Sequence, residues 1–333
     1  MTIADRRSFS DKYFLRAEHI LEADGHDPVV LMQFFCRTNA VLCGMEESLE
    51  LINACEADLE VCALAEGDSI EPWETVLTVR GPYRQFAHLE TLLLGVLARG
   101  TRVATQTRAI VDAAGGKSVL FFGARHDHYL TQSTDGHAAL VGGASGVATD
   151  QQGVRDGVLG LGTMPHALVA AYNGDTVVAA EKFVEHMPDV PFIALVDFAN
   201  DCVGTSLATA RALGDRLQGV RLDTSASLID IALEGVEPPQ YGVTPMLVDA
   251  VRVALDREGF QHVEIVVSGG LTGERVGLFE SSGAAVDAYG VGSAVLRNFG
   301  EFDFTADIVE VDGQPVSKVG RSFKPNPRLV RSD

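Results

Sequence analysis

The sequence predicts an α/β fold that combines a parallel sheet or barrel with a second, α+β part. Three observations lead to this prediction. After about residue 100, helix-like stretches alternate with short apolar strands, which is the pattern of strand–helix–strand units. These strands are uninterrupted and rich in β-branched and aromatic residues, as is typical of parallel strands buried on both faces. Before that point, and again in the last segment of the chain, the alternation is missing.

The N-terminal part mixes helical and β patterns. Residues 1–25 are predicted to form a helix that Ser10 or Asp11 caps and that Gly25 ends. The segments that follow are strand-like at 29–43, helix-like at 45–57 and broken into short β segments at 65–83. This part is therefore expected to be an α+β unit.

The predicted parallel strands occupy the middle of the chain. They are residues 118–125, 192–199, 219–225, 262–270 and 286–293. Residues 302–323 return to a β pattern, with two strands joined by an Asp-Gly turn, and are expected to pack against the N-terminal unit. The expected domains are an α+β domain of residues 1–105 plus 300–333 and a barrel of residues 106–299.

Composition narrows the possible functions. The 333 residues carry 46 acidic and 26 basic side chains, which argues against a nucleic-acid partner because a phosphate-backbone binder needs a basic face. The chain lacks the run of about 18 apolar residues that a membrane span requires. The N-terminus has no apolar signal core, so a cytoplasmic protein is expected. The five cysteines include no C-x-x-C pair and are expected to be reduced thiols.

The last two predicted strands each end in a glycine-rich loop. These loops are Ser268-Gly269-Gly270 and Gly290-Val291-Gly292-Ser293. In α/β barrels, ligands bind at the carboxyl ends of the strands, and the loops after the last two strands often hold phosphate. Glycine lets backbone N–H groups approach an anion closely. Such glycines also occur in ordinary turns, but two adjacent loops of this kind favour a phosphate cradle.

Charged residues end the other predicted strands. Arg125 and Arg221 are candidates for clamping an anion through their planar guanidinium groups; the alternative is pairing with structural carboxylates. Asp197 and Asp223 are candidates for holding Mg²⁺ or sugar hydroxyls; the alternative is capping of the following helices.

A histidine with possible chemistry lies in the segment Gly162-Thr163-Met164-Pro165-His166. Pro165 suits the first turn of a helix, which places His166 near the helix N-terminus. A neutral imidazole is a good nucleophile and general base, although a lone histidine is more often structural.

Taken in order, these motifs resemble those of one family, the nicotinate phosphoribosyltransferases. The matching segments are DKYFL at 11–15, AEGDSIEPWE at 65–74, HLETLLLG at 88–95, FGAR at 122–125, GTMPHALV at 162–169, GVRLDT at 219–224, SGGL at 268–271, YGVGS at 289–293 and KVGR at 318–321. Each motif alone is modest, whereas their order and spacing over nearly the whole chain are specific.

The resemblance implies a type II phosphoribosyltransferase with an irregular TIM-like barrel beside an α+β domain built from both chain ends. It implies transfer of the phosphoribosyl group of phosphoribosyl pyrophosphate to nicotinate, which forms nicotinate mononucleotide in NAD salvage. Mg²⁺ and the co-substrate ATP are implied, as is a homodimer or higher homo-oligomer.

The resemblance also assigns roles to residues. His166 matches the phosphorylated histidine that couples ATP hydrolysis, Asp223 would face the ribose or metal, and Asp197 would be a further metal ligand. The implied substrate contacts are Tyr13, which would stack on the nicotinate ring from the partner subunit, and Thr163, Arg125 and Arg221. The implied ligands of the 5′-phosphate are Ser268, Gly269, Gly270, Gly290, Gly292 and Ser293.

The chain departs from the family pattern at two places. His126 follows Arg125 where many members have a second arginine, and Ala226 stands where many have a second aspartate after Asp223. A phosphoribosyltransferase for nicotinamide or another heterocycle, or a non-catalytic nucleotide-binding homologue, therefore remains an alternative. A decarboxylating quinolinate enzyme would need a denser cluster of Arg and Lys. A Schiff-base aldolase is disfavoured because no predicted barrel strand ends in Lys.

Overall fold

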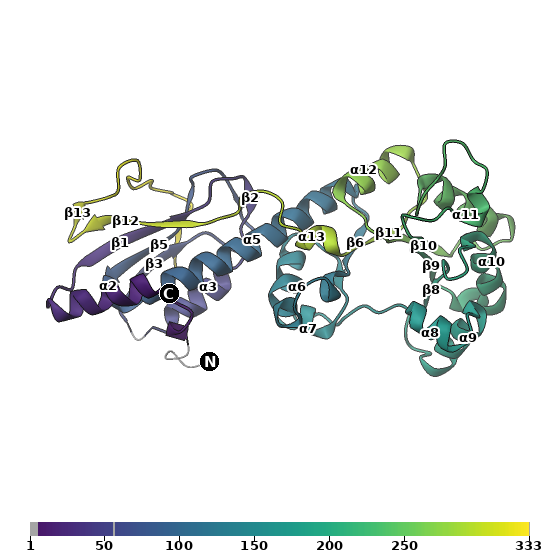
Figure 1. Cartoon of the computed structure of the whole chain (residues 1–333), viewed down its shortest axis with the longest axis horizontal. Coiled ribbons are helices and arrows are strands. Elements are labelled where there is room, and N and C mark those ends of the chain that lie inside the picture. The colour runs from purple at the N-terminus through teal and green to yellow at the C-terminus, as the bar shows by residue number, and fades with distance from the viewer. Residues whose placement is uncertain (1–5, 56, 333) are drawn as a thin grey trace. The chain divides into compact units, whose positions relative to one another are not determined.

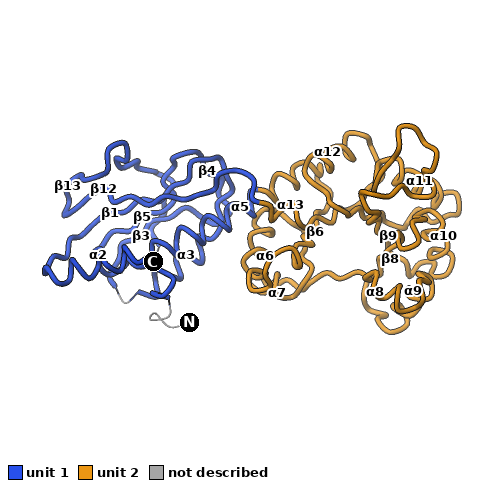
Figure 2. Tube along the Cα trace, in the orientation of Figure 1, with its two compact units in different colours: residues 1–105, 298–333 blue, residues 106–297 orange. Residues whose placement is uncertain are grey.

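The computed structural model of the protein describes residues 6–55 and 57–332, and the chain forms two compact units (Figure 2). Unit 1 comprises residues 1–105 and 298–333, and unit 2 comprises residues 106–297. The helix α5 (Glu90–Ala113) contains the division at residue 105. Within the described residues, no helix is both long and apolar enough to cross a membrane.

Unit 1 is built on an antiparallel sheet of six strands in the order β13-β12-β1-β5-β3-β14. The strands are β1 (Val29–Phe35), β3 (Glu60–Ala63), β5 (Thr75–Pro82), β12 (Thr305–Val311), β13 (Gln314–Pro315) and β14 (Val330–Ser332), and β2 (Ala40–Val41) pairs separately with β4 (Ser69–Ile70). Because β12 pairs with β1, the two ends of the chain build one sheet, as the β pattern of the tail predicted. The sequence did not predict β3 and β14, which pair with each other.

The core of unit 1 lies between this sheet and its helices (Figure 1). The helices are α2 (Lys12–Ala23), α3 (Met45–Asn53), α4 (Tyr83–Phe86), η1 (Ala87–Leu89) and the first part of α5. Met45 of α3 and Leu93 of α5 share one buried cluster with Phe34 of β1. Burying such large apolar side chains stabilises the unit by about 1.5–3 kcal/mol for each of them.

The first predicted helix forms, but its predicted cap does not. Asp11 stands at the N-cap position of α2, yet its side chain accepts no capping hydrogen bond. Asp11 Oδ2 instead accepts a hydrogen bond from Thr91 Oγ1 at 2.9 Å, so a tertiary contact takes the place of the local one. Gly25 follows the helix with a φ of 68°, a conformation that glycine adopts without strain, as its predicted role requires.

Unit 2 contains a parallel sheet of six strands in the order β7-β6-β11-β10-β9-β8. The strands are β6 (Ser118–Phe121), β7 (Gly146–Val147), β8 (Ile193–Leu195), β9 (Gly219–Leu222), β10 (Glu264–Val267) and β11 (Ala288–Val291). The helical elements are η2 (Gly123–Arg125), η3 (Tyr129–Thr131), α6 (Gln132–Val141), α7 (Asp150–Gly153), α8 (His166–Ala171), α9 (Thr176–His186), α10 (Cys202–Leu213), η4 (Gly214–Arg216), η5 (Ile231–Leu233), α11 (Pro245–Arg257), α12 (Gly273–Ser282) and α13 (Ser293–Leu296).

The sheet of unit 2 is a half-barrel with helices on its outer side (Figure 1). All five predicted parallel strands are found, and the short β7 joins them at one edge. The expected combination of a parallel α/β part and a separate α+β part is thus confirmed at this level. The pairings among the described residues end at β7 and β8 and do not close the sheet into a full barrel.

The fold disfavours the charged form of Glu90, the first residue of α5. Burial, together with the neighbouring carboxylates of Asp307 and Asp11, raises the pKa of Glu90 from 4.5 to about 8. The folded protein therefore holds a proton that the unfolded chain releases. Stability from this site is complete below pH 4.5 and is lost as the pH rises toward 8.

We predict that Glu90→Gln raises the free energy of unfolding at pH 9 by on the order of 2 kcal/mol and leaves it nearly unchanged at pH 4.5. Urea unfolding at the two pH values measures the difference. The control is Glu50→Gln, at an exposed position of α3, which is expected to have the same small effect at both pH values. Equal effects of Glu90→Gln at both pH values would contradict the assignment.

Candidate functional site

The strand order of unit 2 gathers the predicted site residues along one edge of the sheet. Strands β6, β11, β10, β9 and β8 are neighbours in that order, and parallel strands present their carboxyl ends at the same edge. The residues that follow these strands are, in the same order, Arg125, Gly292, Ser268, Asp223 and Asp197. Residues that are distant in sequence therefore lie along the same edge of the sheet.

His166 is positioned by a carboxylate at this edge. It is the first residue of α8, with Pro165 at the N-cap position, so the predicted location near a helix N-terminus is confirmed. His166 Nε2 lies 3.0 Å from Asp197 Oδ1. The Asp197 side chain is only 9% exposed, whereas that of His166 is 44% exposed. The carboxylate thus orients an imidazole that solvent and ligands can reach.

Asp197 belongs to a cluster of charged side chains whose mutual interactions oppose the effect of burial. Burial raises the pKa of Asp197, and the negative charge of Asp223 raises it further, while His166 lowers it. The pKa of Arg221 is lowered by burial and by the positive charge of Arg125, and is raised by Asp223 and Asp197. These five side chains therefore form one electrostatic neighbourhood.

Arg221 keeps donor capacity for a ligand. Its guanidinium carbon lies 5.7 Å from the centre of the Phe122 ring, and its Nε is buried without a hydrogen-bond partner. Within the described residues, no carboxylate forms an ion pair with Arg221 or Arg125, in contrast to the Arg80–Glu310 pair of unit 1. The predicted alternative, a structural ion pair at each arginine, is therefore not observed.

The loop after β10 has the geometry of an anion cradle. Gly269 and Gly270 have successive φ angles of 90° and 65°, and among the described residues no acceptor pairs with their N–H groups. Ser268 Oγ donates to Asp223 Oδ1 at 2.9 Å, which ties this loop to the end of β9. Asp197 and Asp223 do not cap the helices that follow them, because the N-caps of α10 and α11 are Asp201 and Thr244.

The two predicted glycines near the end of β11 occupy different environments. Gly290 lies inside the strand, where an added Cβ would come within 2.5 Å of the Phe122 ring. Gly292 lies in the following turn, before α13 begins at Ser293, and an added Cβ there would come within 2.5 Å of His126. Gly290 therefore provides room for packing, and Gly292 provides room for an imidazole.

The remaining predicted contacts are less tied to this edge. Thr163 lies in the segment before α8, and among the described residues it forms no hydrogen bond. Tyr13 belongs to unit 1, on α2, where it is 60% exposed and its hydroxyl lies 3.3 Å from Asp11 Oδ2. Their roles remain predictions.

Sequence reasoning missed two features. The first is Phe122, which contacts Arg221 and fills the space at Gly290; its apolar side chain resembled ordinary strand sequence. The second is a cluster in unit 1 around Trp73, defined by the following distances. The cationic groups of Arg37, Arg321 and Lys324 lie 5.3, 5.0 and 5.2 Å from the Trp73 ring centre. Trp73 and Arg321 lie in the quoted motifs AEGDSIEPWE and KVGR, but no local pattern predicts that these residues come together, because the chain tail supplies two of them.

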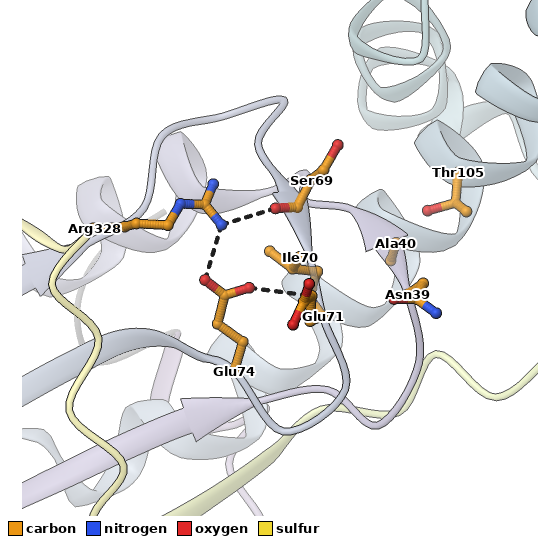
Figure 3. A pocket seen from close by; sticks show the side chains of 8 residues that line it. All are labelled: Asn39, Ala40, Ser69, Ile70, Glu71, Glu74, Thr105 and Arg328. Atoms are coloured by element: carbon orange, nitrogen blue, oxygen red, sulfur yellow. Dashed lines mark hydrogen bonds and ion pairs between the residues drawn. The ribbon is translucent and has the colours of Figure 1, made fainter.

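Unit 1 also contains a cavity of about 630 Å³ (Figure 3). Its central groups bind one another: Arg328 Nη1 donates to Ser69 O at 3.0 Å and to Glu74 Oε1 at 2.8 Å. Glu74 Oε2 accepts the N–H of Glu71 at 2.9 Å. Because these polar groups are already paired, we assign no ligand to this cavity.

A parallel half-barrel with arginines, aspartates and glycine loops at its carboxyl edge, joined to an antiparallel α+β unit, defines the type II phosphoribosyltransferases. The model of the N-terminal domain of quinolinate phosphoribosyl transferase matches residues 11–101, and that of its C-terminal domain matches residues 103–305. The chain therefore belongs to the quinolinate phosphoribosyl transferase family.

Curated relatives are nicotinate phosphoribosyltransferases. One from Mycobacterium tuberculosis is 30% identical over 276 residues, which is 80% of this chain and 57% of the relative. One from Bacillus subtilis is 27% identical over 271 residues, which is 79% of this chain and 52% of the relative. The chain thus spans little more than half the length of these relatives.

Solved structures share the fold. The nicotinate-nucleotide pyrophosphorylase of Pyrococcus furiosus is 35% identical, with a TM-score of 0.85 over 97% of this chain and 80% of that one. Human nicotinic acid phosphoribosyltransferase is 20% identical, with a TM-score of 0.72 over 95% of this chain and 77% of that one. The second likeness concerns the fold alone.

The contact between Gly290 and Phe122 predicts a specific sensitivity at this edge. Gly290→Ala forces a methyl group into the Phe122 ring and is expected to lower the free energy of unfolding by about 1–3 kcal/mol. Gly277→Ala in α12 is the control, because no atom lies within 4 Å of the added methyl group and alanine favours a helix by about 1 kcal/mol. Urea unfolding of both variants tests the contact. Equal free energies of unfolding for Gly290→Ala and Gly277→Ala would show that the Phe122 ring moves aside without cost.

Proposed function

We propose that the protein is a nicotinate phosphoribosyltransferase that converts nicotinate and phosphoribosyl pyrophosphate to nicotinate mononucleotide and pyrophosphate in NAD salvage. The observation that carries the proposal is the His166–Asp197 pair beside two arginines without ion pairs, Arg125 and Arg221. The curated relatives that are named nicotinate phosphoribosyltransferase support the proposal.

In the proposed reaction, the ring nitrogen of nicotinate attacks C1 of the ribose, and the bond from C1 to the pyrophosphate oxygen breaks. Pyrophosphate leaves with the bonding electron pair. Because positive charge develops on the sugar in an oxocarbenium-like transition state, the protein contributes chiefly orientation and electrostatics. Arg125 and Arg221 bind the nicotinate carboxylate or the phosphates, Asp223 faces the ribose, and the Ser268–Gly270 loop holds the 5′-phosphate.

His166 is proposed to couple ATP hydrolysis to this transfer. When the Nε2–H group donates a hydrogen bond to Asp197, the lone pair is on Nδ1, which is then the nucleophile toward the γ-phosphorus of ATP. The N–P bond forms as the bond to ADP breaks, and water later cleaves the phosphohistidine. A phosphoryl group adds about −1.5 to −2 units of charge beside the substrate site.

The carboxylates at this edge fit Mg²⁺. Asp197 and Asp223 each use Oδ1 for a side-chain hydrogen bond, and the negative charge of Asp223 raises the pKa of Asp197. Carboxylate oxygens are the ligands that Mg²⁺ prefers. These two residues would hold the ion, which would neutralise charge on the pyrophosphate group.

Quinolinate, with decarboxylation, is the second candidate acceptor. The family model that matches the chain is named for it. Quinolinate carries two carboxylates where nicotinate carries one, and the electrostatic neighbourhood of the site contains two arginines and two aspartates. That balance favours the singly charged acceptor.

The acceptor and the role of ATP are tested by one steady-state assay. Purified protein is given phosphoribosyl pyrophosphate, Mg²⁺ and nicotinate, nicotinamide or quinolinate, each with and without ATP. We predict that, of the three acceptors, only nicotinate is converted to its mononucleotide and that ATP increases the rate. The rate increase by ATP is expected to be lost in His166→Ala. Turnover of quinolinate with release of CO₂ would replace the lead proposal, and an unchanged ATP effect in the variant would remove the phosphohistidine.

A homodimer in which Tyr13 of one subunit serves the other subunit's site is tested by complementation. With ATP present, Tyr13→Ala is expected to lose most nicotinate turnover, and His166→Ala is expected to lose the part that ATP stimulates. Co-expressed, they form hybrids in which one site has both wild-type residues, so about a quarter of the ATP-stimulated activity of the wild type is expected from random pairing. Activity no higher than the sum of the separate variants would contradict shared sites.

A further inference from the structure

The glycine loops place bare backbone at the carboxyl edge of unit 2. Gly269 and Gly270 offer N–H groups, and Gly292 keeps the turn after β11 free of a side chain. A phosphate monoester bound there carries up to two negative charges. Backbone N–H groups supply only partial positive charge, so a complete site also needs a side-chain donor.

His126 lies directly on one of these loops. Strand β6, which precedes it, pairs with β11, so the loop after β6 is adjacent to the turn at Gly292. A Cβ at Gly292 would come within 2.5 Å of His126 Cε1 and 2.9 Å of its Nδ1. The missing side chain at Gly292 is therefore what lets the imidazole reach the turn.

The position of His126 is fixed, and its side chain is accessible. Its backbone N–H donates to Gly123 O at 3.0 Å at the end of η2, so the short helix holds the residue in place. The residue is exposed, and none of the hydrogen bonds of the described residues uses its ring. By contrast, His128 on the same loop uses Nδ1 to accept the N–H of Leu130 at 3.3 Å.

We infer that the imidazole of His126 is a direct ligand of the phosphate monoester held between the two glycine loops. The inference rests on the proposed function, which makes a phosphoribosyl group the ligand, and adds a side chain that neither the family comparison nor the fold assigns. A ring N–H of His126 donates to a phosphate oxygen, while Gly269 and Gly270 donate from the other side. The chain thereby has one imidazole donor where a second arginine would offer a fork of donors.

The test is the binding of ribose 5-phosphate, with D-ribose as the probe that lacks phosphate, measured by isothermal titration calorimetry without turnover. His126→Ala is expected to weaken ribose 5-phosphate binding about 10-fold, because the variant loses one hydrogen bond to a charged group. His126→Arg is expected to bind at least as tightly as the wild type. His128→Ala, the matched control, is expected to change affinity by less than twofold.

Equal affinity of His126→Ala and the wild type would overturn the inference, as would wild-type protein that binds ribose 5-phosphate no better than D-ribose. If His126→Ala fails to fold, a tenfold loss in His126→Phe that is absent in His126→Arg decides the question in the same way. Failure of the proposed function has a different signature. In that case no pyridine acceptor is converted, while the dependence of ribose 5-phosphate binding on His126 persists.

Discussion

Charge compensation at a buried edge is the interaction on which the site depends. Asp197 and Arg221 both lose hydration where they lie. Burial raises the pKa of Asp197 and lowers that of Arg221, so it favours the neutral form of each side chain. The negative charges of Asp223 and Asp197 raise the pKa of Arg221, and His166 lowers that of Asp197, so neighbouring groups oppose the effect of burial on both. Removing one member would leave an uncompensated buried charge, which generally costs several kcal/mol. Within the described residues, Arg221 Nε is nevertheless buried without a hydrogen-bond partner.

The fold makes this compensation possible because its strands are parallel. Asp197, Asp223 and Ser268 come from three successive strands in space, β8, β9 and β10, although 71 positions separate the first from the last. The short strands are buried on both faces and stand in fixed register, Leu195 opposite Arg221 and Val267 opposite Leu222. A polar residue placed just after each strand is therefore delivered to a common edge without long side chains or mobile loops.

Much of this arrangement was predictable, because strand pattern and strand-end chemistry are local signals. The five parallel strands, the carboxyl-edge residues and the helix start at His166 follow from short windows of sequence. The Asp11 cap was wrong because Thr91, which is remote in sequence, competes for the carboxylate. The contact of Gly290 with the Phe122 ring has no local signal, because the ring belongs to the segment that follows a neighbouring strand. The Trp73 cluster depends on the tail returning to the first sheet, which no local window contains.

Two histidines at one edge show how context assigns different work to one side chain. His166 Nε2 lies 3.0 Å from Asp197 Oδ1, a contact that favours the proton on Nε2 and, in the proposed reaction, leaves the lone pair of Nδ1 as the nucleophile. Among the described residues, no carboxylate contacts the His126 ring. The ring lies instead against Gly292, which offers only backbone groups. An imidazole oriented by an acid is suited to covalent and proton chemistry, whereas one beside bare N–H groups is suited to binding an anion. In the proposed reaction, their separate neighbours, rather than their residue type, assign phosphoryl transfer to His166 and phosphate binding to His126.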